Sequence, residues 1–274
     1  MNKERWVFNM KVLYFDCFSG ISGDMTVGAL MDLGVDPKMI EQELRKLNLE
    51  DEYELKWEKT IKKGISATKM KVILKSQQEA EAHHHEYEHH YHHHVDNHSH
   101  HHRHYDTIVQ LIQDAELNES VKQLSLNIFE RIGKAEGNIH NLPLEKVHFH
   151  EVGAIDSIVD IVATAVAIDQ LQPDKIVSSP VPTGSGKIRI DHGIYPVPAP
   201  ATLEILKNIP LQKCEIPFEL TTPTGAGIIA ALSQEFGTIP SMQVSQIGYG
   251  AGTKDFSDRP NVLRVFLGEM NSSK

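Results

Sequence analysis

Short apolar runs alternate with amphipathic stretches along most of the chain, which predicts strands and helices in one mixed fold. Apolar or alternating runs predict strands at 11–16, 146–151, 175–178, 187–190, 242–247 and 261–267. Apolar residues at helical spacing predict helices at 24–33, 37–47, 105–114, 119–139, 156–171, 199–206 and 224–236. Two further alternating segments, 53–59 and 65–75, are joined by Lys62-Lys63-Gly64 and predict a hairpin.

The order of these elements lacks the regular strand–helix–strand spacing of a doubly wound sheet. We therefore expect an α+β or irregular α/β fold, in which helices pack on a mixed sheet. Residues 77–104 interrupt the pattern, because they show no periodic apolar face and are mostly histidine, glutamate and other polar residues. We expect a flexible, disordered loop there, between an N-terminal lobe at 10–76 and a main lobe at 105–270.

Composition and charge exclude several classes of protein. Apolar residues make up 40% and charged residues 23% of the chain, as in an ordinary globular protein. No run of about 18 apolar residues predicts a membrane-spanning helix, and the formal net charge of −10 argues against a nucleic-acid partner. With two cysteines and no basic-then-apolar leader, the chain is expected in the cytoplasm.

Histidine is the unusual component, because 13 of the 17 histidines fall between His83 and His104. Imidazole binds nickel, zinc and copper well, and many imidazoles on one flexible segment raise the local ligand concentration. An expression tag and a solvated linker are the alternatives, and the internal position of the run argues against a tag. We expect this segment to capture or store a transition metal. Its histidines are His83, His84, His85, His89, His90, His92, His93, His94, His98, His100, His101, His102 and His104.

A glycine- and serine-rich loop at 16–24 joins the first predicted strand to the first predicted helix. Backbone N–H groups in such a loop can hold a phosphate, and a carboxylate beside it can hold the accompanying divalent ion. A tight turn with an aspartate helix cap explains the same residues equally well. The catalytic candidates here are Asp16, Cys17 and Asp24, and the phosphate-binding candidates are Ser19, Gly20, Ser22 and Gly23.

A second candidate site contains His148, His150 and Glu151, which lie in a stretch that alternates as a strand does. Alternation along a strand places His148 and His150 on the same face, so that both imidazoles can approach one metal ion. Asp156 and Asp160 are four residues apart on the following helix, where they can complete a histidine and carboxylate site. Hydrogen-bonded surface histidines and an acidic helix start are the alternative interpretation.

Further turns rich in glycine and threonine also suit phosphate. Lys187 follows a Gly-Ser-Gly turn, although the spacing is not that of a Walker motif. Thr222 and Thr224 precede an apolar helix, so one is a cap candidate and the other a phosphate contact. Ordinary turns explain each feature taken alone. Three glycines in 248–252 predict one more flexible loop.

Together, these motifs resemble the LarC nickel-insertion family. The similarity runs from Met10 to about Glu269 and includes the histidine run and the segments 14–25, 147–154, 156–160, 196–201, 221–225 and 247–253. The resemblance implies an enzyme, a metal chelatase, that inserts Ni²⁺ into pyridinium-3,5-bisthiocarboxylic acid mononucleotide and forms a nickel–carbon bond. It also implies CTP and Mg²⁺ or Mn²⁺ as cofactors, and the nickel pincer cofactor of lactate racemase as the product.

Members of this family are typically longer and carry a C-terminal nucleotide-binding domain, so the chain resembles their N-terminal part. A C-terminal domain or a separate chain is therefore an expected partner, and self-association is left open. We expect His148, His150 and Glu151 to transfer nickel, while the loop at 16–24 holds phosphate or a divalent ion. The competing hypotheses are a nickel-storage protein or metallochaperone without turnover, and a Mg²⁺-dependent phosphate-handling enzyme.

Overall fold

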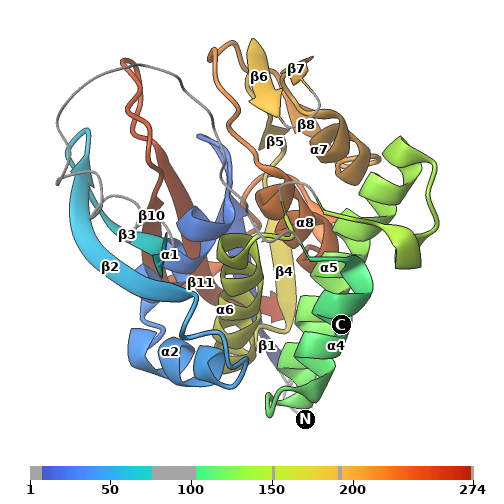
Figure 1. The fold of residues 1–274 in the computed structure, drawn as a ribbon. Helices are drawn as coiled ribbons and strands as arrows, with labels where there is room; N and C mark the ends of the chain where they lie inside the picture. Colours follow the sequence, from blue (N-terminus) through green and yellow to red (C-terminus); the bar gives the residue numbers. More distant parts are fainter. Residues whose placement is uncertain (1–7, 76–102, 150–151, 191–192, 273–274) are drawn as a thin grey trace, which may run out of the picture.

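The computed structural model describes residues 8–75, 103–149, 152–190 and 193–272, and it confirms a mixed α+β fold (Figure 1). The predicted metal ligands at 83–102, together with His150 and Glu151, lie outside these residues. None of the described helices combines the length and the apolar character that crossing a bilayer requires.

Within the described residues, seven strands form the main sheet in the order β2-β3-β10-β11-β1-β4-β9. Their bounds are β1 (Phe8–Asp16), β2 (Tyr53–Lys62), β3 (Ile65–Leu74), β4 (Lys175–Ser178), β9 (Glu235–Phe236), β10 (Gln243–Ala251) and β11 (Val262–Ser272). β1 pairs antiparallel with β11 and parallel with β4, so both ends of the described chain meet in the sheet. Two small sheets are formed by β5 (Val181–Pro182) with β8 (Leu211–Gln212), and by β6 (Lys187–Ile190) with β7 (Gly193–Pro196).

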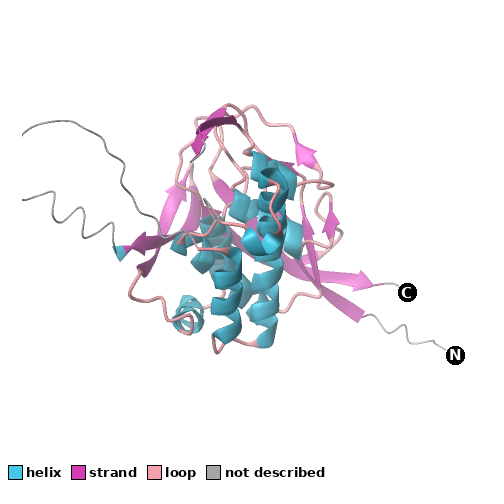
Figure 2. Ribbon diagram, turned by 45° about the vertical axis from the view of Figure 1, so that its right-hand side comes forward, coloured by secondary structure: helices cyan, strands magenta, loops and turns pink. Residues whose placement is uncertain are grey.

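The helices gather beside the strands, as Figure 2 shows. They are α1 (Gly23–Leu33), α2 (Pro37–Arg45), α4 (Tyr105–Asp114), α5 (Glu119–His140), α6 (Ile155–Leu171), α7 (Pro200–Ile205) and α8 (Pro223–Leu232). Leu13 and Phe15 of β1 are fully buried in the large core that α1, α5, α6 and α8 share. Val12 and Tyr14 alternate with them and belong to a smaller apolar cluster on the other face of the sheet.

Glycines in β10 let α1 pack directly on the sheet. A Cβ atom added at Gly248 would lie 2.2 Å from the backbone oxygen of Ala29, and one at Gly250 would lie 1.8 Å from that of Met25. The flexible loop predicted at 248–252 is therefore wrong, because β10 continues through Ala251. Its alternate glycines clear one face of the strand for the helix.

The strand predicted at 146–151 is also wrong for its described part. The 3₁₀ helix η1 (Leu144–Lys146) occupies its start, and a single isolated bridge joins His148 to His104. The alternation in the sequence instead reflects Val147 and Phe149, which are buried in the core. Alternate burial alone does not produce a ladder when no partner strand lies alongside.

Other boundaries follow the predictions closely. The helix at 105–114 and the strands at 175–178 and 187–190 are confirmed. The helix predicted at 224–236 ends at Leu232, because the chain then turns to pair β9 with the edge of β4.

Candidate functional site

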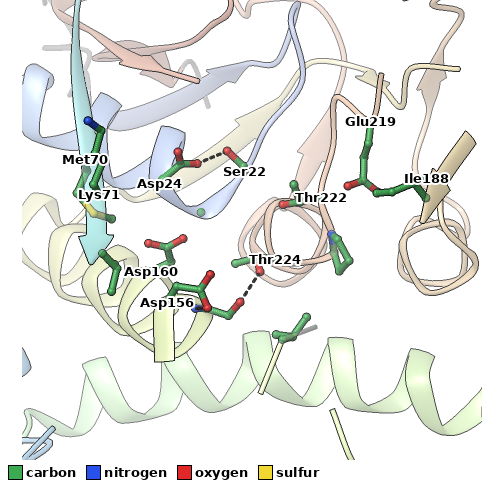
Figure 3. Close-up of a pocket in the computed structure, with 15 residues that line it drawn as sticks. Ser22, Asp24, Met70, Lys71, Asp156, Asp160, Ile188, Glu219, Thr222 and Thr224 are labelled. Atoms are coloured by element: carbon green, nitrogen blue, oxygen red, sulfur yellow. Dashed lines mark hydrogen bonds between the residues drawn. The ribbon is translucent and has the colours of Figure 1, made fainter. Parts of the chain in front are cut away.

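A cavity of about 410 Å³ lies where three helices begin. The N-termini of α1, α6 and α8 form one wall, and β3 forms another (Figure 3). The lining residues are Ser22, Gly23, Asp24, Met70, Lys71, Val72, Val152, Asp156, Ser157, Asp160, Ile188, Glu219, Thr222, Pro223 and Thr224. Because helix N-termini carry partial positive charge, this wall favours negatively charged groups beside it.

Two loops that the sequence suggests as phosphate-binding lie side by side at this cavity. Ile21 forms a parallel bridge with Thr221, and the Thr222 N–H donates to the Ile21 carbonyl at 3.1 Å. Gly20 has a φ of +92°, and a Cβ there would lie 2.0 Å from the Leu220 oxygen. Glycine is therefore needed at this contact, which fixes the glycine- and serine-rich loop against the start of α8.

Thr222 and Thr224 hold the start of α8 in different ways. Thr222 is the N-cap residue, and its hydroxyl accepts a hydrogen bond from the Gly225 N–H at 3.2 Å. The Thr224 hydroxyl lies 3.4 Å from the Ser157 hydroxyl and so links α8 to the first turn of α6. Thr222 therefore acts as the predicted cap, and both threonines line the cavity.

Four acidic side chains line the cavity, and three of them, Asp24, Asp156 and Asp160, interact electrostatically with one another. Asp24 Oδ1 accepts hydrogen bonds from the Ser22 hydroxyl and the Met25 N–H, while burial raises the pKa of this carboxyl. Burial, and then the charges of Asp24 and Asp156, raise the pKa of Asp160 well above its ordinary value. Asp160 Oδ1 is buried and has no hydrogen-bond partner among the described residues. This oxygen is available to a bound cation or to a donor on a ligand.

Gly23 allows Asp160 to approach the start of α1. A Cβ added at Gly23 would lie 2.3 Å from Asp160 Oδ2, so any larger residue would displace the carboxylate. The backbone N–H of Asp24 donates to Asp160, which is the arrangement that a helix N-terminus favours. The cavity therefore combines carboxylates with backbone donors at a single point.

The described residues contain no group of three His, Cys, Asp or Glu side chains arranged to hold a metal ion. Mg²⁺ commonly uses one or two carboxylates, several waters and the phosphate of a substrate. The oxygens of Asp24 and Asp156 fit that mode of binding, because both side chains line the cavity beside helix N-termini. The residues present therefore suit a cation that arrives with an anionic ligand.

Asp16 and Cys17, two predicted catalytic residues, lie outside the cavity lining. Asp16 Oδ2 accepts a hydrogen bond from Arg264 Nε at 2.9 Å, which closes the end of β1 against β11. The Cys17 side chain is fully buried, and this burial raises the pKa of its thiol to about 12.

Three predicted phosphate ligands, Ser19, Gly20 and Lys187, also lie outside the cavity lining. The hydroxyl of Ser19 donates to the Pro260 carbonyl at 2.8 Å and so fixes the loop rather than facing the cavity. Lys187 is exposed on β6, while its neighbour Ile188 reaches the cavity wall.

The structure brings two of the predicted metal ligands together. The rings of His104 and His148 have centroids 4.4 Å apart, and their backbones form an antiparallel bridge. His104 ends the histidine run, and His148 precedes the cavity residue Val152 by four positions. The run therefore rejoins the described fold beside the segment that leads into the cavity.

Sequence reasoning missed the wall that β3 provides. Met70, Lys71 and Val72 line the cavity, and Glu219 faces it from the opposite side in Figure 3. The available signal was Lys71, a charged residue within a strand-forming run. Glu219 carried no signal in the sequence.

The fold is a mixed α+β domain with an acidic cavity at the start of three helices. The chain belongs to the nickel insertion protein family, whose model matches residues 13–274.

Curated relatives support this membership. A pyridinium-3,5-bisthiocarboxylic acid mononucleotide nickel insertion protein from Geobacillus kaustophilus is 56% identical over 260 residues, which are 95% of this chain and 60% of the relative. The protein of that name from Clostridium acetobutylicum is 54% identical, with 96% of this chain and 65% of the relative covered. That from Clostridium kluyveri is 49% identical, with 97% and 64% covered. The chain thus spans roughly three fifths of the length of these relatives. No solved structure matches the chain significantly.

Proposed function

We propose that this chain takes part in inserting Ni²⁺ into pyridinium-3,5-bisthiocarboxylic acid mononucleotide, which yields the nickel pincer cofactor. The observation that carries the proposal is the cavity in which three carboxylates meet three helix N-termini. The reacting end of this substrate needs both halves of this arrangement, because its thiocarboxylates are anions and its metal is a cation. The particular substrate is taken from the names of the relatives.

The chemistry of insertion requires a proton acceptor. A ring C–H bond breaks, its electron pair forms the nickel–carbon bond, and the proton leaves to a base, so nickel remains Ni²⁺. Carboxylates of Asp24 and Asp156 line the cavity and can accept this proton. The two thiocarboxylate sulfurs of the substrate supply soft ligands, so the protein itself needs only a transient hold on the metal.

Cation and nucleotide requirements follow from the same cavity and from the family. Asp24 and Asp156 would hold Mg²⁺ or Mn²⁺ beside the reacting end of the substrate, and the divalent ion supplies charge neutralisation when bound. CTP dependence is proposed for an assembly that includes a C-terminal nucleotide-binding domain or a separate chain. Both cysteines are free in the structure, as expected of a protein that works in the reducing cytoplasm.

The nickel supply is proposed to pass through histidines. The run at 83–104 would collect Ni²⁺, and the pair His104 and His148 lies where this run meets the segment leading to the cavity. Neutral imidazoles bind and release nickel without holding it in a closed site, which suits transfer. His150 and Glu151 are proposed to take part in the same step.

Reconstitution tests the proposal directly. The chain is incubated with the mononucleotide, Ni²⁺, Mg²⁺ and CTP, with and without the C-terminal domain of the Geobacillus relative, and product is followed by pincer absorbance and bound nickel. Asp24→Asn should abolish product, while the exposed control Asp258→Asn should retain it.

Two outcomes would favour other functions. Nickel binding without product in either mixture would indicate storage or a metallochaperone. Nucleotide turnover that is indifferent to nickel would indicate a Mg²⁺-dependent phosphate-handling enzyme.

A further inference from the structure

The hairpin formed by β2 and β3 carries charge opposite to that of the whole chain. Residues 53–75 contain seven lysines and two glutamates, which gives +5 in a protein whose formal net charge is −10. A concentration of one sign beside a cavity attracts ligands of the other sign. The hairpin is therefore the part of the described fold best suited to an anion.

The pairing of β2 with β3 places three of these lysines on one face of the hairpin. Lys56 of β2 lies directly opposite Lys71 of β3, and Lys69 lies two residues further along the same face, opposite Glu58. Like charges that face each other across two strands repel, and a bound anion would add to the offset that the neighbouring glutamates give. Lys56 and Lys71 reach exposed glutamates, at 3.1 Å from Glu54 and 3.2 Å from Glu58.

Lys69 differs from its neighbours, because it is half-buried and forms no ion pair within the described part of the chain. A second cavity of about 370 Å³ lies over these residues, and Lys56, Lys69 and Lys71 all line it. Lys71 also lines the first cavity, so the two are neighbours. Lys69 in turn lies within electrostatic reach of Asp24, one of the three carboxylates.

Close backbone packing fixes the position of the hairpin relative to α1, the helix that carries Asp24. A Cβ added at Gly28 of α1 would lie 2.5 Å from the Thr68 oxygen of β3, so helix and strand are in direct contact. The Thr68 hydroxyl also donates to Asp32 of α1 at 2.9 Å. Lys69, the next residue, is thereby fixed relative to Asp24 at the start of the same helix.

We propose that Lys69 and Lys71 bind the phosphomonoester of the mononucleotide substrate in the second cavity, while its reacting ring occupies the first. The assignment rests on the proposed function, since that function defines the substrate. It divides the ligand by charge: the non-reacting phosphate lies over the lysines, and the metal-binding end lies over the carboxylates. Charge-assisted contacts of this kind are the strong ones in phosphate recognition.

Binding in the absence of nickel tests the assignment. Calorimetry compares the mononucleotide with the nucleoside obtained by removing its phosphate, for the parent chain and for the double variant Lys69→Ala, Lys71→Ala. The parent should bind the mononucleotide about tenfold or more tightly than the nucleoside, and the variant should bind both alike. Lys69→Arg with Lys71→Arg should restore the preference, and Lys213→Ala, an exposed lysine paired with Glu215, should leave it unchanged.

The possible failures are distinguishable. The variant could instead lose affinity equally for the mononucleotide and the nucleoside while keeping a native circular dichroism spectrum. That result would assign the lysines to the thiocarboxylates and overturn the phosphate assignment. An unchanged preference in the variant would overturn it too. If the parent chain binds neither ligand, the proposed function itself fails, and this assignment fails with it. In reconstituted insertion, the variant should raise KM at least tenfold with kcat retained.

Discussion

The buried carboxyl of Asp160 makes the stability of the folded protein depend on pH. Its carboxyl is buried beside two further carboxylates, and its pKa is held well above the ordinary value. Folded Asp160 therefore keeps its proton at pH values at which the unfolded chain, with a pKa of about 3.9, has lost it. Because the folded state binds this proton more tightly, the proton stabilises the folded protein. This contribution is fully present below the unfolded pKa and is lost as pH rises towards the folded pKa.

Asp160→Asn should therefore raise the free energy of unfolding at neutral pH, because the variant has no buried carboxyl that must ionise. The decline in stability as pH rises above the unfolded pKa should also become smaller, with Asp24 contributing to what remains. Urea denaturation at several pH values measures both effects. Asp258→Asn is the control, because Asp258 has a lowered pKa and should gain no stability.

Cys17 leads to a prediction about reactivity. With a thiol pKa of about 12, only about one molecule in ten thousand carries the thiolate at pH 8, and the side chain is fully buried. Alkylation of the folded protein should therefore modify Cys214, which is partly exposed, and leave Cys17 unmodified. Mass spectrometry should find one label in the folded state and two after denaturation. Labelling of Cys17 at the rate of Cys214 would revive its role as a nucleophile.

Among the elements, α1 has the largest influence on the site. It begins at the cavity with Gly23 and Asp24, and its other turns lie against β10 and β3. The position of the carboxylates thus depends on packing far along the helix. Small residues at the contact set the separation between helix and sheet.

Gly250→Ala should test this dependence. Its new Cβ would lie 1.8 Å from the Met25 carbonyl oxygen, so α1 must move, at a cost of about 3 kcal/mol in the free energy of unfolding. Activity should fall as well, because the start of α1 moves with the helix. Gly237→Ala is the matched control: its Cβ would meet nothing within 4 Å, and stability should change by less than about 0.5 kcal/mol.

Periodicity predicted the elements well where one face of a segment is buried along its whole length. The helix at 105–114 and the strand at 175–178 show this. It failed at 248–252, where glycines signal close packing as readily as a turn, and at 146–151, where buried alternate residues lack a partner strand. Distinguishing these cases requires knowledge of which segments become neighbours, and a single sequence does not contain it.

At the scale of the whole molecule, about half of the cavity could be predicted. Asp24, Thr222 and Asp156 were predicted because caps and acidic helix starts have a local signature. Their convergence was not predictable, since it depends on bridges such as that between Ile21 and Thr221, exactly two hundred residues apart. The β3 wall was missed for the same reason, although its lysines are conspicuous in the sequence.

The two ends of the segment 76–102 meet at one residue of the described fold. The Lys75 N–H donates to the Glu52 carbonyl at 3.0 Å, and Arg103 Nη2 donates to Glu52 Oε1 at 2.7 Å. A short glycine-serine linker should therefore replace this segment without disturbing the fold, since closing a short loop costs little. The melting temperature should change by no more than a few degrees.

Removing 76–102 takes away twelve histidines but leaves His104 beside His148. We expect the number of nickel ions bound per chain to fall sharply, and insertion to fall at limiting nickel but persist at saturating nickel. A variant of full length with the twelve histidines changed to serine separates loss of ligands from loss of length. Complete loss of insertion at saturating nickel, in a folded variant, would show that the run acts in the reaction itself and not as a nickel reservoir.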